Sequence, residues 1–219
     1  DMLICRSDRP LSHDVREKIA LFTNVEPECV VDGRDVETIY EVPLVYAEQE
    51  VDELVLEKLD LTCPRPNLRE WKRFVERVKN PSGEITIGIC GKYTEHKDAY
   101  KSISESFVHA GAANNVKVHL RWVRAEDIEN EGAEKHLQGL SGLLVAPGFG
   151  ERGIEGKIRA VQFVRTNAIP FFGICLGLQC AVIEYARNMC GLGHANSTEF
   201  KQTDQNVIDM MIEQKKVKE

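Results

Sequence analysis

Hydrophobic and polar positions follow two different patterns along this chain, and the change falls near residue 84. Before that point the pattern predicts a short buried strand at residues 2–5 and helices at residues 14–22, 35–40 and 49–59. One strand and a few short helices bury little surface by themselves. We therefore expect residues 1–60 to be the C-terminal part of an α/β domain that begins upstream.

A linker is predicted at residues 62–66, because two prolines within three residues prevent regular backbone hydrogen bonding. Asn67 then stands three positions before Glu70, which is the spacing of a helix capping box. Apolar residues repeat at helical spacing from there, at Leu68, Trp71, Val75 and Val78. We assign residues 61–82 to a linker and a connecting helix.

Strands and helices alternate after residue 84. The predicted strands are residues 85–90, 116–123, 143–146 and 170–174, and the predicted helices are residues 98–110, 155–166 and 178–189. This alternation predicts βαβ units and a parallel sheet with helices on both faces. We expect residues 83–219 to form this domain, with residues 116–123 as an edge or half-covered strand because apolar and polar residues alternate there.

Composition narrows the class of protein. The chain has 28 Lys and Arg against 35 Asp and Glu, a net charge of −7, which argues against a broad nucleic-acid or membrane surface. No window approaches the roughly 18 apolar residues of a membrane span, and no signal peptide is recognisable, so we expect a cytoplasmic protein. The seven cysteines form no C-x-x-C pair, and neither a disulfide framework nor a metal site is predicted.

The clearest chemical signal is G-I-C-L-G at residues 173–177, where the last predicted strand turns into a helix. It has the form of a G-x-nucleophile-x-G elbow with sulfur in place of oxygen. Glycines flank Cys175 because the nucleophile of such a corner is strained and larger neighbours would collide with the packed strand and helix. The helix N-terminus favours the thiolate, and the amide of Leu176 is free to bind an oxyanion.

The helix after this corner carries apolar residues at helical spacing. They are Leu178, Ala181, Val182, Tyr185, Ala186 and Met189. We expect this face to be buried and to point away from Cys175. Most cysteines are small inert core residues, and that interpretation applies to Cys180 and Cys190.

Residues 148–153 match G-x-G-x-x-G, a pattern that indicates a dinucleotide site between a strand and a helix. Here Pro147 occupies the tight turn, and two glutamates near the start of the helix would repel a pyrophosphate. We therefore expect this loop to form the second side of an oxyanion hole, in which the amide of Gly148 faces the carbonyl group that Cys175 attacks.

Three segments, residues 147–150, 170–179 and 196–200, resemble the class I glutamine amidotransferase domain of the CTP synthase family, and residues 3–9 and 18–22 resemble the end of that family's amidoligase domain. The resemblance implies a flavodoxin-like amidotransferase fold preceded by a partial α/β amidoligase segment. It implies a ligase that hydrolyses L-glutamine through a cysteine thioester and uses the ammonia to convert UTP to CTP. It also implies ATP with Mg²⁺, GTP as activator, no covalently bound cofactor, and a homotetramer.

The same resemblance assigns roles to individual residues. The glutaminase residues are the nucleophile Cys175, the oxyanion amides of Gly148 and Leu176, and the glutamine pocket of Phe149, Gln179 and Glu199. Glu199 would receive the α-amino group of glutamine. The amidoligase residues are Lys18 for UTP and Arg6, Asp35 and Val36 for ATP. From spacing alone, Lys18 is an ordinary solvated helix lysine and Glu199 an ordinary surface carboxylate.

The chain departs from the family pattern in two ways. Many members have P-G-G-F-G where this chain has P-G-F-G at residues 147–150, so one loop glycine is absent and the orientation of the loop peptide is open. None of the six histidines is followed two residues later by glutamate, as the family's catalytic His-x-Glu requires. We therefore expect this stretch by itself to be a poor glutaminase, and the phosphate-binding loop of the amidoligase is also missing from it.

Two alternatives stay open at this point. One is a non-catalytic α/β module that binds glutamine or a partner domain, which would suit the missing His-x-Glu. The other is an unrelated cysteine hydrolase with the same elbow, in which His194 serves as the base.

Overall fold

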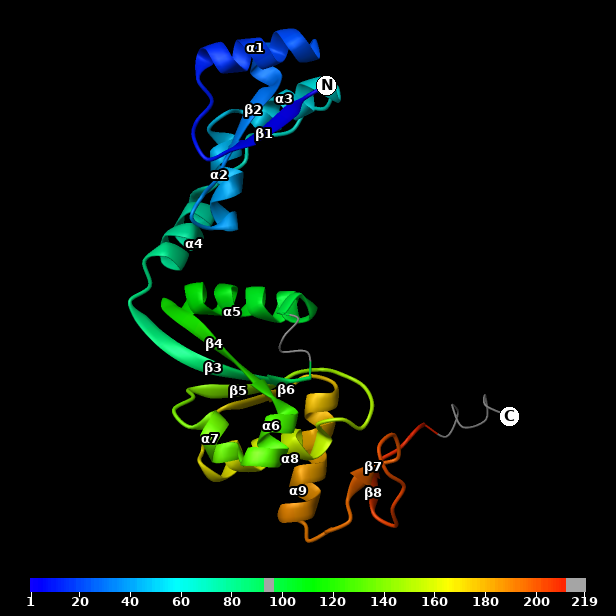
Figure 1. Cartoon of the computed structure of the whole chain (residues 1–219). Helices are drawn as coiled ribbons and strands as arrows, with labels where there is room; N and C mark the ends of the chain where they lie inside the picture. Colours follow the sequence, from blue (N-terminus) through cyan, green and yellow to red (C-terminus); the bar gives the residue numbers. More distant parts are fainter. Residues whose placement is uncertain (93–96, 212–219) are drawn as a thin grey trace, which may run out of the picture. The chain divides into compact units, whose positions relative to one another are not determined.

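The computed structural model describes residues 1–92 and 97–211 (Figure 1). The chain divides into two compact units, Asp1–Pro81 and Ser82–Glu219. The assignment of residues 1–60, 61–82 and 83–219 to separate parts of a larger enzyme stays a prediction. In the part of the chain that the structure describes, no helix has the length and apolar character that would be needed to cross a membrane.

The first unit is built on two parallel strands, β1 (Leu3–Ser7) and β2 (Val30–Arg34). Its helices are α1 (His13–Thr23), α2 (Val42–Ala47), α3 (Val51–Lys58) and α4 (Arg69–Lys79), with short 3₁₀ turns at η1 (Pro27–Cys29) and η2 (Ile39–Glu41). Strand β2 was not predicted, because Val30 and Val31 are followed directly by Asp-Gly, a turn signal. Pairing with β1 buries both valines.

Three predicted details of this unit are wrong. The turn of helix expected at residues 35–40 is the shorter η2, which runs directly into α2. On α1 the expected apolar side of Val15, Ile19 and Phe22 is not buried, since only Ala20 is buried and Val15 and Phe22 are exposed. The capping box before α4 does not form, because the side chain of Glu70 pairs with Arg73 instead. Asn67 Oδ1 does accept a hydrogen bond at 3.1 Å from the amide of Arg69, the first residue of α4.

The second unit contains the predicted parallel sheet. Its strands are β3 (Gly83–Gly91), β4 (Val116–Arg124), β5 (Gly142–Val145) and β6 (Phe171–Gly173), in the order β4-β3-β5-β6. All three pairings are parallel. This is a flavodoxin-like order, in which successive strands are added on one side of β3 and then on the other, and ligands bind beyond the carboxyl ends of the strands at this switch between β3 and β5. Strand β4 is an edge strand with alternating burial, as predicted.

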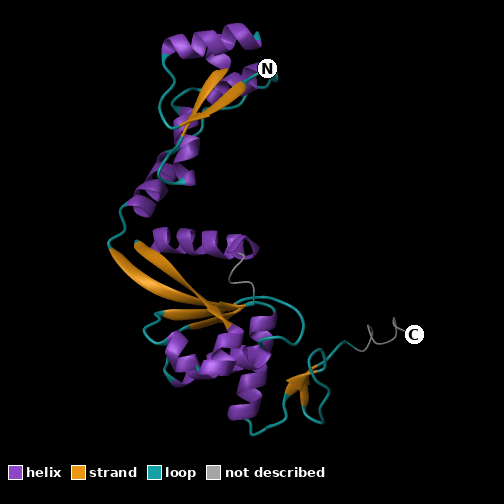
Figure 2. Ribbon diagram, viewed as in Figure 1, coloured by secondary structure: helices purple, strands orange, loops and turns teal. Residues whose placement is uncertain are grey.

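Helices cover both faces of this sheet, which confirms the predicted fold class (Figures 1 and 2). After the turn η3 (Lys97–Tyr100), α5 (Lys101–Asn114) lies on one face. The other face carries α6 (Ala125–Glu131), α7 (Ala133–Leu137), α8 (Ile154–Thr166) and α9 (Leu176–Asn188). The short helices α6 and α7 were not predicted, nor was the parallel pair β7 (Asn196–Ser197) and β8 (Asn206–Ile208).

Burial on both faces explains the continuous apolar run in β5. Leu144 packs with Ile89 and Tyr100 on the α5 side. Leu143 and Val145 point to the opposite side and join the core formed with α6, α7 and α8. A strand of this kind has no polar face, which is typical of the interior of a parallel sheet.

The buried face of α9 differs from the prediction. Its buried residues are Leu176, Gly177, Cys180, Ile183, Glu184 and Ala186, whereas Leu178, Val182, Tyr185 and Met189 are exposed. Both sets follow helical spacing, so periodicity could not choose between them. The choice is made by the corner before the helix, because α9 begins at Leu176, two residues earlier than predicted, and Gly177 lies directly against β5.

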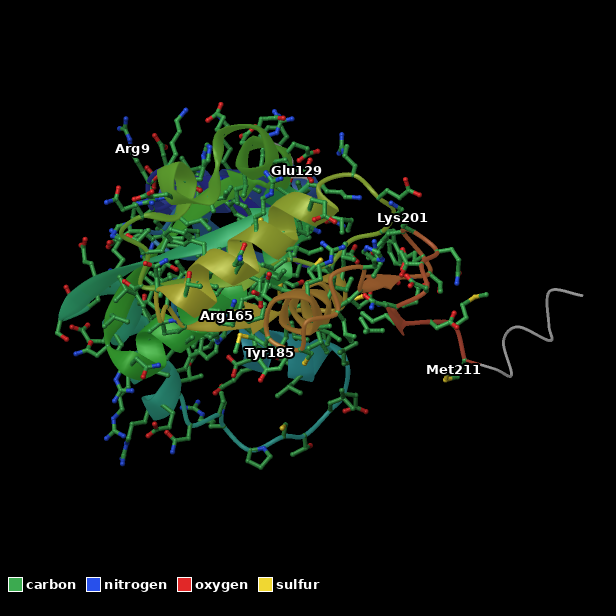
Figure 3. The ribbon with its side chains drawn as sticks, turned by 90° about the horizontal axis from the view of Figure 1, so that it is seen from below. Arg9, Glu129, Arg165, Tyr185, Lys201 and Met211 are labelled. Atoms are coloured by element: carbon green, nitrogen blue, oxygen red, sulfur yellow. The ribbon has the colours of Figure 1, made fainter. Side chains whose placement is uncertain are left out.

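A buried ion pair joins α8 to α9. Arg165 projects from the last turn of α8 (Figure 3), and its Nη2 lies 2.7 Å from Oε1 of Glu184. The Glu184 side chain is only 1% exposed, and Asn188 Nδ2 donates to the same oxygen at 3.0 Å. Two donors therefore satisfy a carboxylate that would otherwise be costly to bury.

Candidate active site

Cys175 occupies the corner between β6 and α9 and is the N-cap residue of that helix. Its backbone has φ 53° and ψ −107°, a region that residues with a side chain rarely adopt. Its side chain is exposed. The strained backbone predicted for a nucleophile elbow is therefore confirmed, and the thiol is open to a substrate.

The glycines on either side of Cys175 are required by packing. A Cβ atom at Gly173 would lie 2.6 Å from the carbonyl carbon of Gly177. A Cβ atom at Gly177 would collide with the carbonyl oxygen of Val145 on β5. The corner can close only because both positions lack side chains, as the sequence pattern predicts.

The loop after β5 meets this corner. The Ala146 amide donates to the carbonyl oxygen of Cys90 at 2.9 Å, and Pro147 has no N–H, so Gly148 carries the first free amide of the loop. A Cβ atom at Gly148 would lie 3.4 Å from Cδ2 of Leu176. Leu176 opens α9, where main-chain amides have no helical partner. The two residues predicted as oxyanion donors thus lie side by side.

Glu199 reaches the same loop from a distant part of the sequence. Its Oε1 accepts from the amide of Gly150 at 3.4 Å. Its own amide donates to Oγ of Ser197, a buried residue at the end of β7. Phe149 stands between Gly148 and Gly150 in this loop, and its side chain is 82% exposed. The predicted pocket residues Phe149 and Glu199 are therefore neighbours through Gly150.

Gln179 lies one turn into α9, where its amide donates to the carbonyl oxygen of Cys175 at 3.1 Å. Its side-chain Oε1 is buried and accepts no hydrogen bond from the described residues. A buried amide oxygen without a donor is unfavourable in the free protein.

Two lysines that the sequence analysis missed lie at this loop, and one of them is hydrogen-bonded to it. Lys92 follows β3, and its Nζ donates to the carbonyl oxygens of Phe149 and Gly150, the latter at 3.1 Å. Burial and then the nearby Arg152 lower the pKa of Lys92. A lysine directly after β3, the strand at which the strand order switches sides, is the signal that could have found it. The second lysine, Lys157 on α8, is fully buried below Gly148.

The other cysteines near the sheet differ from Cys175. Cys90 and Cys180 are buried, and burial raises the pKa of Cys90 to about 12 and that of Cys180 to about 11. Both thiols are therefore protonated at neutral pH and shielded from reagents. Cys190 is exposed, but it follows the end of α9 and its φ is not positive, so it lacks the strained backbone of Cys175.

His194, the alternative base, lies by the far end of α9. Arg187, in the last turn of the helix, donates from Nε to the carbonyl oxygen of Ala195 at 2.7 Å. A helix rises about 1.5 Å per residue, so Arg187 lies about 18 Å along the axis from Cys175. His194 Nδ1 instead lies 3.3 Å from Asp204 Oδ1. This geometry argues against a hydrolase in which His194 serves Cys175.

In the first unit the structure brings together three of the four predicted nucleotide-site residues. Arg6 Nε lies 2.9 Å from Asp35 Oδ1, and the Asp35 amide donates to the carbonyl oxygen of Ser7 at 2.9 Å. Val36 follows directly. Lys18 is exposed on α1, and no hydrogen bond among the described residues joins it to the other three.

Comparison with known proteins identifies the family. Residues 95–218 match the family model described as glutamine amidotransferase class-I. The chain belongs to this family. Residues 1–61 match a second model, described as the CTP synthase N-terminus. The two matches agree with the predicted resemblance of the two parts of the chain and confirm it.

Curated relatives of this amidotransferase chain are named CTP synthase. Those of Chloroherpeton thalassium and Chlorobaculum parvum are each 58% identical over 224 aligned positions, which cover all of this chain and 40% of the relative. That of Cytophaga hutchinsonii is 54% identical over 99% of this chain and 41% of its own length. The chain thus spans about two fifths of the length of these relatives.

A solved structure also resembles the chain. It is the glutaminase domain of Trypanosoma brucei CTPS with bound acivicin, which is 39% identical and superposes with a TM-score of 0.55. The match covers 58% of this chain and 50% of that chain. It confirms the amidotransferase fold of the second unit independently of the family model.

Proposed function

We propose that this chain is the glutaminase-bearing part of a CTP synthase. Cys175 attacks the carboxamide of L-glutamine, and the ammonia released serves the ATP-dependent amination of UTP to CTP in the whole enzyme. The observation that carries the proposal is the strained, exposed Cys175 at the start of α9, next to the amides of Gly148 and Leu176. The similarity to CTP synthases along the chain supports this substrate over others.

In the proposed reaction the Cys175 thiolate forms a bond to the carboxamide carbon of glutamine. The carbonyl oxygen takes the negative charge and is bound by the amides of Gly148 and Leu176. Collapse of this intermediate breaks the C–N bond, the nitrogen leaves with an added proton as ammonia, and a thioester remains. Water then hydrolyses the thioester to glutamate. The base that moves these protons is the family's His-x-Glu, which this sequence does not contain.

Three side chains would bind the amino-acid end of glutamine. The Glu199 carboxylate receives the α-ammonium group in exchange for its 3.4 Å contact with the Gly150 amide. The buried Oε1 of Gln179 accepts a hydrogen bond from the substrate, which fills its missing contact. Phe149 covers the substrate from the solvent side.

The nucleotide roles are also part of the proposal. Arg6, Asp35 and Val36 stand at the carboxyl ends of β1 and β2, where α/β sheets commonly bind ligands, which supports the ATP assignment. Lys18 for UTP rests on the family pattern alone, as do GTP activation, a cytoplasmic location and assembly as a homotetramer. Within residues 1–92 and 97–211 no three His, Cys, Asp or Glu side chains are grouped to hold a metal ion. Mg²⁺ that enters with ATP would need only one or two protein carboxylates beside the phosphates, and Asp35 is the carboxylate among the residues assigned to ATP.

Acivicin labelling tests the glutaminase assignment directly. The chain is treated with acivicin, digested, and the modified peptide is mapped by mass spectrometry. We expect one adduct, at Cys175, which disappears in Cys175→Ser and which L-glutamine slows in a concentration-dependent manner. Labelling of the exposed Cys63 and Cys190 at the same rate as Cys175, with no protection by glutamine, would overturn the proposal.

Replacement of Glu199 tests the pocket separately from the nucleophile. A hydrogen bond to a charged group contributes about 1.5–3 kcal/mol, so Glu199→Gln should slow acivicin labelling roughly tenfold or more. Alkylation by iodoacetamide, which carries no α-ammonium group, should be unchanged. Glu151→Gln, at an exposed glutamate next to the same loop, is the matched control and should affect neither reagent. An equal effect of the two substitutions would contradict the role of Glu199.

A further inference from the structure

Lys157 is a buried charge that the proposed reaction does not use. The residue is 0% exposed, and its Nζ, which carries three N–H donors, donates to no acceptor among the described residues. Burial of an ammonium group without a hydrogen-bond acceptor is strongly unfavourable. A methionine would fill the same space without this cost. The lysine would therefore be stabilised by any nearby acceptor that turned toward it.

The position of Nζ points to the oxyanion loop. It lies 3.6 Å from the place that a Cβ atom of Gly148 would take. Its electrostatic neighbours are the buried thiols Cys90 and Cys180, Lys92 and Glu126. None of these groups is hydrogen-bonded to it. Glu126 Oε2 is also buried without a hydrogen-bond partner, but Glu126 already pairs with Arg152 through Oε1. The oxyanion loop is the main chain that the structure places beside Nζ.

The geometry of the peptide bond identifies the loop group that Nζ can bind. In a trans peptide the N–H and the C=O point in opposite directions. When the Gly148 N–H turns toward the substrate oxygen, the carbonyl group of Pro147, which belongs to the same peptide, turns away from the substrate and toward the interior. A carbonyl buried in this way requires a donor.

The rest of the loop is already held by the other lysine. Lys92 donates to the carbonyl oxygens of Phe149 and Gly150. These contacts restrain the two peptides that follow Gly148 and leave the Pro147–Gly148 peptide without a corresponding restraint. The orientation of this single peptide decides whether Gly148 supplies an oxyanion donor beside that of Leu176.

We propose that Lys157 is a positioning residue for the oxyanion loop: when the Gly148 amide turns toward the substrate, Nζ donates to the Pro147 carbonyl oxygen, a hydrogen bond that the free protein does not make, and thereby holds the amide in place. This inference rests on the proposed glutaminase function. It adds an interior donor to the site that acts through the Gly148 peptide and touches neither glutamine nor Cys175.

The test compares two reagents on Cys175 in the whole chain and in Lys157→Met. Acivicin requires the oxyanion donors, because its ring nitrogen gains negative charge as the thiolate adds, whereas iodoacetamide reacts by simple displacement. We expect Lys157→Met to slow acivicin labelling tenfold or more and to leave the iodoacetamide rate within twofold. Lys157→Gln, which keeps a neutral donor, should recover part of the acivicin rate. Lys201→Met, at an exposed lysine, should change neither rate.

The outcomes separate this inference from the proposed function. If the parent chain is labelled at Cys175 but Lys157→Met slows both reagents equally or neither, Lys157 has no positioning role and the glutaminase assignment stands. If the parent chain is not labelled at all, the glutaminase assignment itself fails. If Lys157→Met loses its cooperative thermal transition, a crystal structure of the unsubstituted chain with acivicin bound to Cys175 tests the inference instead. Nζ within about 3.2 Å of the Pro147 carbonyl oxygen supports the inference, and a separation beyond about 4 Å overturns it.

Discussion

The corner at Cys175 and the corner at Arg6 both follow the carboxyl ends of parallel strands, but they are held in different ways. Main-chain contacts at Gly173 and Gly177 close the Cys175 corner, and α9 packs behind it. At the other corner the Arg6 and Asp35 side chains are 84% and 56% exposed and meet in a single ion pair. Close packing transmits any displacement, whereas solvent screens a surface ion pair. Substitutions around Cys175 should therefore cost far more stability than substitutions at Arg6.

The ion pair behind the Cys175 corner offers the largest contrast. Arg165→Met leaves the Glu184 carboxylate, which is 1% exposed, without its cation, and should cause the largest loss in free energy of unfolding of the substitutions compared here, although Arg165 itself is 32% exposed. Urea unfolding can be followed by the fluorescence of Trp122 in a Trp71→Phe background, since each unit contains one of the two tryptophans. A loss below about 1 kcal/mol would show that this ion pair stabilises the protein no more than the exposed pair of Arg6 and Asp35.

The contact between Gly177 and β5 should have the next largest effect. Gly177→Ala forces α9 away from the Val145 carbonyl oxygen, and overpacking of this kind costs about 1–3 kcal/mol or somewhat more. The same unfolding experiment measures it. Gly193→Ala is the matched control, because no heavy atom lies within 4 Å of its added Cβ, and it should stay within about 0.5 kcal/mol of the parent. Similar losses at both glycines would mean that the elbow is not specially packed.

Strain at Cys175 predicts a substitution that increases stability. Positive φ at a residue with a side chain costs on the order of 1–3 kcal/mol, and glycine relieves most of it. Cys175→Gly should therefore raise the free energy of unfolding by about 1 kcal/mol while it abolishes acivicin labelling. Cys190→Gly, where φ is not positive, should give no gain. A Cys175→Gly protein no more stable than the parent would show that the corner stores no strain.

The surface pair should give the smallest effect. Arg6→Met breaks the 2.9 Å contact with Asp35, and exposed ion pairs contribute about 0–1 kcal/mol. Unfolding of the first unit, followed by Trp71 in a Trp122→Phe background, measures the change. A loss as large as that from Arg165→Met would remove the contrast between the two corners.

Local sequence signals predicted the elements that depend on near neighbours. The G-x-C-x-G pattern predicted the strained Cys175 corner correctly, because its glycines act on residues a few positions away. The same kind of signal failed at β2, whose two valines become a strand only when β1 lies beside them. It also failed on α9, where two apolar faces compete and contact with β5 selects one.

By itself, then, the amino-acid sequence determined the alternation of strands and helices and the chemistry of the corner, since both follow from backbone preferences within a few residues. Tertiary structure alone decided that Glu199 meets the Gly150 amide, that Lys92 holds the loop carbonyls, and that Lys157 lies buried below Gly148. The first two contacts join residues about 50 or more positions apart. They depend on how parallel strands and their helices stack, which no short window of sequence can specify.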